Sequence, residues 1–218
     1  MRQPQRGFGA GEPPGSPGPP PLVRSADEPL RGWLRAVVAT PGLTAIHDLE
    51  EARRVLLEDS LRGLELVRRY EGPIVDVGSG GGAPGIPLAL ALPEREVTLL
   101  EATGRKCEFL RGVAPPNATV VHGRAEEQEP DRFGVAVAKA LAQPPTAAEW
   151  CLPLVAPGGA AILWVGPTAE PDRVARVAER LAAELVDSPP GFLVLEKHGP
   201  TPAGFPRRPG MARKRPLA

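Results

Sequence analysis

The residues best placed to bind a ligand lie in one glycine-rich stretch, residues 74–87. A short apolar run there contains the acid Asp76. The turn that follows holds Gly78, Gly80 and Gly82, and an apolar stretch able to begin a helix comes next. Glycine is needed where the backbone adopts positive φ or approaches a ligand closely. Because a turn between strand and helix also leaves free amide N–H groups, the stretch predicts a ligand-binding loop.

The position of the acid narrows the choice of ligand. Dinucleotide sites carry their acid roughly 20 residues after the glycines and face a pyrophosphate. An acid inside the turn repels phosphate but suits a cationic amine, and S-adenosylmethionine (SAM) carries such an amine and no phosphate. A Walker A loop ends in Gly-Lys-Ser/Thr, and it is excluded because the first lysine of the chain is Lys106. A short-chain dehydrogenase needs a tyrosine after the loop, and it is excluded because the only tyrosine, Tyr70, precedes the loop. The sequence therefore predicts SAM as cofactor, with Asp76 pairing its amine; an ordinary glycine turn is the alternative.

Two further segments could complete a SAM site. Glu101 ends the second expected strand, 23 residues after Gly78, and an acid there can accept both ribose hydroxyls. The amide of Ala125 and the carboxylate of Glu126 follow the third expected strand and could read the adenine edge. The alternatives are a solvated acid at the first place and a helix N-terminus, where the dipole favours an acid, at the second.

Lys139 ends the fourth expected strand, at the sheet edge where the transferred methyl group would emerge. We predict that it positions the reaction; a plain surface lysine is the alternative. The sequence holds no Pro-Cys dipeptide, whose thiolate could attack a pyrimidine ring. It also holds no Asp/Asn-Pro-Pro-aromatic motif, which could accept hydrogen bonds from an exocyclic amine. Guanine N7 needs neither, because it is already nucleophilic and loses no proton on methylation. Catalysis would then consist mainly of holding acceptor and methyl roughly 3–3.5 Å apart and in line.

The elements that would carry these residues alternate along the chain. Strands are expected at residues 73–77, 96–101, 118–121, 135–139, 160–165 and 192–198, and helices after Pro84, Gly104, Pro145 and Thr168. Such alternation predicts an α/β fold with a mainly parallel sheet and helices on both faces. Ligands of such sheets bind at the carboxyl ends of the strands, which is where the glycine loop lies.

The chain divides into four expected regions. Residues 1–25 form a Pro/Gly-rich tail that we predict to be disordered, since it cannot bury a core. Residues 26–72 carry apolar side chains at spacings of three and four, which predicts a helical cap. Residues 73–205 form the SAM-binding core, and residues 206–218 a basic tail.

Composition excludes several classes of protein. The 26 basic and 26 acidic residues balance, so the whole chain has no net charge that would attract nucleic acid. Cys107 and Cys151 form neither a zinc site nor a disulfide framework, and the three histidines lack metal-ligand spacing. There is no apolar signal segment and no run of about 18 apolar residues. We expect a soluble, cytoplasmic monomer without metal or membrane.

Several segments together resemble the RsmG (GidB) family of bacterial small-subunit rRNA guanine-N7 methyltransferases. The resemblance covers roughly residues 30–218, and its most specific parts are the loop at 76–87 and the Pro-Arg-Arg-Pro-Gly-Met segment at 206–211. The other similar stretches are 42–46, 59–61, 104–110, 123–126 and 138–142. The resemblance implies a Rossmann-like class I SAM-dependent methyltransferase fold, SAM as cofactor and 16S rRNA of the 30S subunit as partner.

The family's functional residues carry over onto named positions. Its SAM contacts fall on Gly78, Ala83, Ala125, Glu126 and Lys139, and its acidic ribose position is Glu101. The family usually has arginine where this chain has Lys139, which keeps the charge but loses the planar fork. A family histidine is replaced by Leu56. Both departures concern rate or substrate docking more than fold.

The basic tail fits an RNA substrate. Its five cations stand beside Pro209 and Gly210, which favour an extended chain over a helix. We expect the tail to lie apart from the SAM site and to contact phosphates without reading sequence. A solvated charged terminus is the alternative. The residues concerned are Arg207, Arg208, Arg213, Lys214 and Arg215.

Two other functions stay open at this point. The chain could methylate another RNA or a small molecule. It could also be a SAM-binding ribosome-assembly factor without activity, which only Lys139 and Leu56 suggest.

Overall fold

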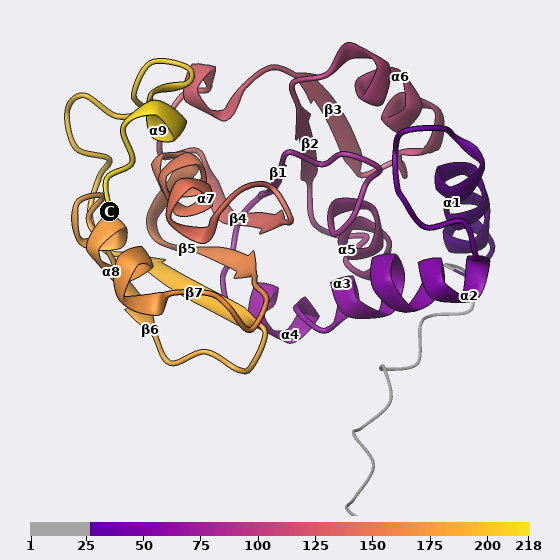
Figure 1. Cartoon of the computed structure of the whole chain (residues 1–218), viewed down its shortest axis with the longest axis horizontal. Coiled ribbons are helices and arrows are strands. Elements are labelled where there is room, and N and C mark those ends of the chain that lie inside the picture. The colour runs from indigo at the N-terminus through magenta and orange to yellow at the C-terminus, as the bar shows by residue number, and fades with distance from the viewer. Residues whose placement is uncertain (1–26) are drawn as a thin grey trace, which may run out of the picture.

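A seven-stranded sheet forms the centre of the molecule (Figure 1). The computed structural model describes residues 27–218, so the tail predicted at residues 1–25 lies outside the described part. The strand order is β3-β2-β1-β4-β5-β7-β6. The strands are Ile74–Val77 (β1), Val97–Glu101 (β2), Ala118–His122 (β3), Phe133–Lys139 (β4), Val155–Trp164 (β5), Ala183–Val186 (β6) and Phe192–Lys197 (β7).

The sheet places a ligand site at the end of β1. Strands β1 to β5 pair in parallel, whereas β7 runs antiparallel to both β5 and β6. The order reverses between β1 and β4, and such a switch point is where α/β sheets bind ligands. All of β1 is buried. Alternate residues face opposite sides, so Ile74 joins one apolar cluster while Val75 and Val77 join the other.

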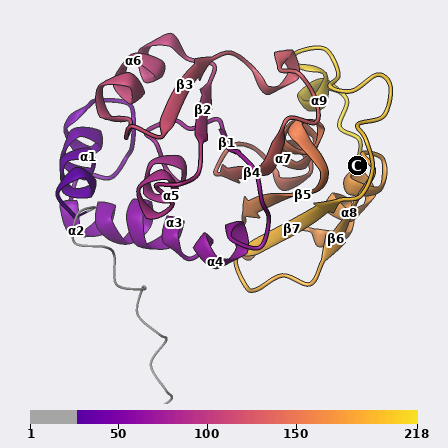
Figure 2. The same cartoon turned by 180° about the vertical axis from the view of Figure 1, so that it is seen from behind.

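Helices cover both faces of the sheet (Figures 1 and 2). One face packs against α5 (Gly85–Ala91) and α6 (Gly104–Val113), and the other against α7 (Pro144–Cys151) and α8 (Pro171–Glu179). The predicted α/β fold, mainly parallel with helices on both faces, is confirmed. None of the helices in residues 27–218 has the length and apolar character needed to cross a membrane.

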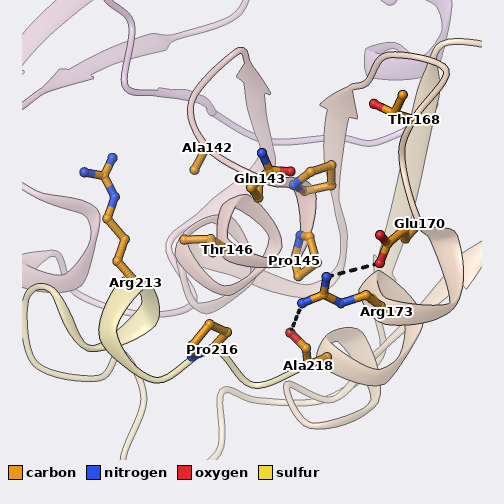
Figure 3. Close-up of a pocket in the computed structure, with 11 residues that line it drawn as sticks. Ala142, Gln143, Pro145, Thr146, Thr168, Glu170, Arg173, Arg213, Pro216 and Ala218 are labelled. Atoms are coloured by element: carbon orange, nitrogen blue, oxygen red, sulfur yellow. Dashed lines mark hydrogen bonds and ion pairs between the residues drawn. The ribbon is translucent and has the colours of Figure 1, made fainter.

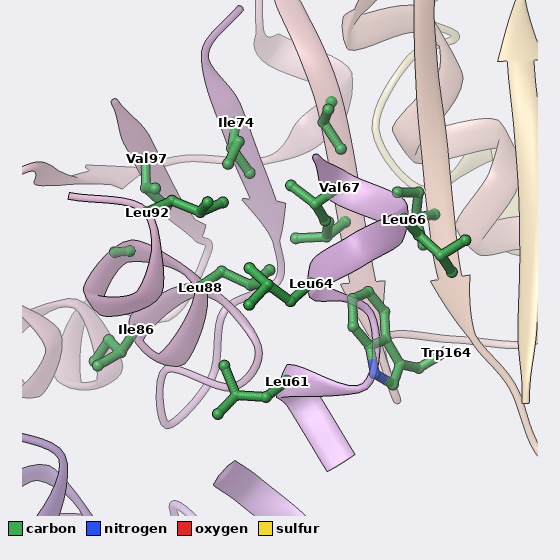
Figure 4. Close-up of a cluster of buried hydrophobic side chains, with 14 of the residues drawn as sticks. Leu61, Leu64, Leu66, Val67, Ile74, Ile86, Leu88, Leu92, Val97 and Trp164 are labelled. Carbon is green, nitrogen blue, oxygen red and sulfur yellow. The ribbon is translucent and has the colours of Figure 1, made fainter. Parts of the chain in front are cut away.

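A helical segment precedes the sheet and shares its core. Figure 4 shows Leu61, Leu64 and Val67 of this segment lying against Ile74 of β1 and Leu88 of α5, all in one apolar cluster. The cap therefore packs as part of the core. Its elements are α1 (Asp27–Ala39), α2 (Leu49–Ala52), a π-helix (Arg53–Glu58), α3 (Asp59–Leu61) and α4 (Leu64–Val67).

Three details differ from the sequence prediction. Strand β6 is not predicted, because four residues at a sheet edge are too few to show a clear alternation. Strand β5 begins at Val155, five residues before the expected start. The prediction that the basic tail is extended is wrong. Residues Met211–Lys214 form a short helix, α9, whose N-cap Gly210 has a φ of +82°.

Candidate active site

An open cleft of about 460 Å³ lies at the carboxyl ends of β1, β2 and β3. This volume falls in the range of small-molecule sites, roughly 300–1,000 Å³. The cleft brings together the start of the glycine loop, the acid that ends β2 and the segment that follows β3. Four of the predicted cofactor residues line it: Gly78, Glu101, Ala125 and Glu126.

Gly78 turns the chain from β1 into the loop. Its φ is +74°, a conformation that β-branched side chains avoid. Its amide and that of Ser79 both donate to the carbonyl of Leu100, at 2.8 and 3.1 Å, which fixes the turn against β2. A Cβ at Gly78 would lie 2.3 Å from Cδ1 of Leu141. The conformation favours glycine here, and a Cβ would in addition displace the end of the Leu141 side chain.

Glu101 ties the loop to the start of α6. The amide of Gly80 donates to its Oε2 at 2.9 Å, and the amide of Thr103 donates to its Oε1 at 2.8 Å. The residue is only 6% exposed, yet it lines the cleft. A carboxylate has about four acceptor positions, so each oxygen can accept one further hydrogen bond. A rigid acceptor of this kind suits a pair of hydroxyls.

The far side of the cleft offers further polar groups. Ala125 and Glu126 open a short 3-10 helix, and Oε1 of Glu126 accepts from the amide of Gly210 at 3.1 Å. Trp150 also lines the cleft, and its buried Nε1–H has no hydrogen-bond partner among the described residues. A buried donor without a partner is costly. A ligand with acceptor atoms, such as the adenine or the carboxylate of SAM, therefore fits the groups present.

Asp76 does not line the cleft, contrary to the prediction. It is 1% exposed, and its Oδ2 accepts from the amide of Gly85, the first residue of α5, at 3.0 Å. Its side chain lies on the same face of β1 as Ile74, the face that α5 covers. Its Oδ1 is buried without a partner in the described residues. Burial raises the pKa of Asp76 to about 7. The geometry supports a role in joining loop and helix rather than in pairing with an amine.

Asp76→Asn is expected to remove a pH dependence from folding stability. The pKa of Asp76 is about 7 in the folded protein against an ordinary 3.8, so folding takes up a proton. The stabilisation that protonated Asp76 contributes to the folded state is fully present below about pH 4 and is lost as the pH rises through 7. Between pH 5 and pH 8 the natural protein should lose roughly 2–3 kcal/mol through this group, and the variant none of it. Urea unfolding at both pH values measures this; parallel pH profiles would contradict it.

The rest of the glycine loop is held by the cap. The carbonyl of Gly81 accepts from Nε1 of Trp33, in α1, at 2.7 Å. A Cβ at Gly82 would lie 3.0 Å from the same indole nitrogen. Gly80, Gly82 and Ala83, all predicted SAM contacts, are not among the residues that line the cleft. They shape the loop that presents Gly78.

Lys139 reaches the cap and does not line the cleft. Its Nζ lies 2.7 Å from Oδ2 of Asp59 and also donates to the carbonyl of Val55 in the π-helix. The side chain therefore ties the end of β4 to the cap. The structure gives no support to its predicted roles as a SAM contact and as the residue that positions methyl transfer.

The basic tail folds onto α7 beside the cleft. Arg207 makes a bidentate ion pair with Glu149, with Nε–Oε1 2.5 Å and Nη2–Oε2 2.6 Å. The guanidinium of Arg213 lies over the ring of Trp150, 5.1 Å from its centroid, and Arg213 and Gly210 line the cleft. The tail thus lies beside the cleft rather than apart from it, and Arg207 is paired within the protein; contact of the tail with RNA stays a prediction. Three other cations of the tail are exposed: Arg208, Lys214 and Arg215.

Among the cleft-lining residues that sequence reasoning did not assign to the cofactor site are Leu141, Trp150 and Arg213. A signal existed for Leu141, since it lies two residues after Lys139, just beyond the end of β4. Trp150 stands in a helix whose apolar residues indicate core, and Arg213 stands in a basic run. Neither pattern predicts a place beside the cofactor.

The sheet order, the antiparallel β7, the glycine loop after β1 and the acid that ends β2 define a class I SAM-dependent methyltransferase. Among solved structures, an O-methyltransferase from neocarzinostatin biosynthesis in complex with SAM matches with a TM-score of 0.49 and 17% identity. The match covers 68% of this chain and 57% of that one.

Sequence comparison is more specific. A model of the GidB family, described as rRNA small subunit methyltransferase G, matches residues 33–187. The ribosomal RNA small subunit methyltransferase G of Synechococcus elongatus is 38% identical over 198 residues, covering 80% of this chain and 82% of the relative. That of Rubrobacter xylanophilus is 36% identical over 217 residues, covering 86% and 80%. This chain belongs to the GidB family of rRNA small subunit methyltransferases, which confirms the resemblance seen in its motifs.

Proposed function

We propose that this chain transfers the methyl group of SAM to N7 of a guanine in 16S rRNA of the small ribosomal subunit, in the cytoplasm. The observation that carries the proposal is the cleft at the switch point of the sheet, where Gly78 and Glu101 meet. Family membership supports ribosomal RNA as the substrate. The names of both relatives refer to the small ribosomal subunit.

Each residue of the cleft has a distinct part in this proposal. Gly78 leaves room for the cofactor beside the backbone. Glu101 accepts the ribose hydroxyls on the lone pairs that Gly80 and Thr103 leave free. The segment that contains Ala125 and Glu126 lies beside the adenine. Bound SAM supplies a methyl group made electrophilic by its sulfonium.

The cleft suits an acceptor that is already nucleophilic. The two carboxylates that line it, those of Glu101 and Glu126, already accept hydrogen bonds from backbone amides. Guanine N7 attacks the methyl carbon with its own lone pair, and the C–S bond breaks with its electrons returning to sulfur. No proton leaves the base, so no general base is required. The protein contributes alignment of the two reactants, which alone lowers barriers substantially.

Ribosomal RNA would meet a cationic surface beside this cleft. Arg208, Lys214 and Arg215 are exposed on the segment that also supplies Gly210 and Arg213 to the cleft. Lysine and arginine contacts to phosphates give affinity that falls steeply with salt. The exposed cations of the tail would thus hold RNA, while Gly210 and Arg213 of the same segment would line the cofactor cleft.

A methyl-transfer assay tests the function. Small subunits that lack the modification are incubated with SAM labelled in its methyl group, and the labelled position is mapped by strand cleavage at 7-methylguanine. The proposal expects one methyl group per subunit, on N7 of a guanine in 16S rRNA. Label on another atom or another RNA would point to a different methyltransferase. SAM binding without transfer would point to an assembly factor.

A further inference from the structure

Arg213 lies between the cofactor cleft and a second open cleft of about 500 Å³, and it lines both (Figure 3). Figure 3 shows its side chain extending from α9 away from Glu170 and Arg173, which line the opposite side of the second cleft. Its guanidinium lies over the ring of Trp150, 5.1 Å from the centroid. Trp150 lines the cofactor cleft and not the second cleft. The charged end of Arg213 is therefore turned toward the cofactor cleft.

The segment that carries Arg213 is anchored on both sides of α9. Before the helix, Arg207 makes its bidentate ion pair with Glu149 of α7. After the helix, Nη2 of Arg173 donates to the main-chain oxygen of Ala218 at 2.6 Å, one of the dashed contacts in Figure 3. The backbone of α9 is therefore held in place beside α7, and Arg213 has a defined position at the cleft.

The same segment touches the end of the cleft that is proposed to hold the adenine. The amide of Gly210 donates to Oε1 of Glu126 at 3.1 Å, and both residues line the cleft. Glu126 belongs to the segment after β3 that lies beside the adenine in the proposed function, whereas Glu101 takes the ribose. Gly210 is the N-cap of α9, and Arg213 follows it by three residues, so the two are neighbours on the helix surface. These contacts connect Arg213 with the adenine end of the cleft.

An arginine in this position is chemically suited to a purine ring. The guanidinium is planar, delocalised and weakly hydrated, so it packs on aromatic faces, and nucleic-acid bases stack on arginine planes in the same way. Arg213 is exposed, and within residues 27–218 no hydrogen bond or ion pair engages its guanidinium. Its contact with Trp150 therefore leaves surface and donors available to a ligand in the cleft.

We propose that Arg213 is a cofactor-binding residue, whose guanidinium packs on the adenine base of SAM. The proposal rests on the function proposed above, because it requires SAM in this cleft. Arg213, which the sequence predicts to contact RNA, then serves the cofactor instead. The tail becomes part of the cofactor site as well as a surface for RNA.

Arg213→Met tests the proposal by calorimetric titration in the absence of RNA. Methionine can still pack on Trp150, but it lacks the charged plane. The two ligands are S-adenosylhomocysteine and methylthioadenosine, which keeps the adenine and the ribose but lacks the amino-acid part. The variant should bind both more weakly than the natural protein, by roughly five- to twentyfold, because a contact between a cation and an aromatic ring is lost. The matched control Lys214→Met changes the next residue, which is exposed and does not line the cleft, and should bind both within about twofold.

The pattern of losses decides what Arg213 contacts. Natural affinity of Arg213→Met for both ligands would overturn the proposal and leave the assignment of the cleft to SAM standing. A loss confined to S-adenosylhomocysteine would place Arg213 at the carboxylate of the cofactor, which also overturns the contact with adenine. An equal loss in Lys214→Met would show that displacement of the tail, rather than the guanidinium, is responsible. Absence of S-adenosylhomocysteine binding by the natural protein would overturn the proposed function as well.

Discussion

Gly78→Val is expected to weaken SAM binding strongly while the sheet remains folded. The new Cβ would lie 2.3 Å from Cδ1 of Leu141, at the edge of the cleft. Valine must also adopt a φ near +74°, a strain of about 1–3 kcal/mol that shifts the loop. We expect affinity to fall by roughly a hundredfold or more, about 2.7 kcal/mol. Isothermal titration with SAM measures the loss.

A second glycine separates backbone strain from blockage of the cleft. Gly204 has a φ of +90° and open space around its Cβ position, and it does not line the cleft. Gly204→Val should lower the melting temperature but leave SAM affinity within about twofold (~0.4 kcal/mol). If the two variants, Gly78→Val and Gly204→Val, had equal affinity for SAM, the glycine loop would not be part of the cofactor site.

Arg207→Met is expected to be among the most destabilising substitutions in the tail. Glu149 has a side chain only 4% exposed, and Arg207 is its bidentate partner. Removing the cation leaves a buried carboxylate unpaired, which costs about 3–5 kcal/mol. The tail would also lose its anchor to α7, and with it the placement of Gly210 and Arg213 at the cleft. Urea unfolding measures the stability, and SAM titration the effect on the cleft.

Two companion variants isolate the buried charge. Arg208→Met changes the adjacent, exposed arginine and should stay within about 0.5 kcal/mol of the natural protein. The double variant Arg207→Met with Glu149→Leu should recover much of the loss, because an apolar pair can replace a buried ion pair at little cost. Equal stability of Arg207→Met and Arg208→Met would show that the ion pair contributes nothing.

The cofactor cleft could be predicted because its parts share one edge of the sheet. Glu101 and the 125–126 segment each follow a parallel strand, and the carboxyl ends of parallel strands meet at that edge. Their meeting with Gly78 therefore follows from the order of elements along the chain. No knowledge of side-chain contacts is needed for such a prediction.

The contacts that could not be predicted join distant parts of the chain. Arg207 and Glu149 stand 58 residues apart, and Lys139 and Asp59 lie on different elements of the fold. A charged residue gives no local sign of its partner, so the tail resembles a solvated cationic terminus. For Asp76, the sequence fails to predict the direction in which the side chain points. Because β1 is buried on both faces, its sequence does not show which face the acid joins.

Titration with S-adenosylhomocysteine is the most direct test of the cofactor cleft. The natural protein should bind it, and Glu101→Gln should weaken binding by at least about tenfold, since a charged hydrogen bond contributes roughly 1.5–3 kcal/mol. The control Glu108→Gln changes an exposed acid in α6 that does not line the cleft, and should match the natural protein within about twofold. Absence of binding by the natural protein, or equal affinity in the Glu101 and Glu108 variants, would contradict the assignment of this cleft to SAM.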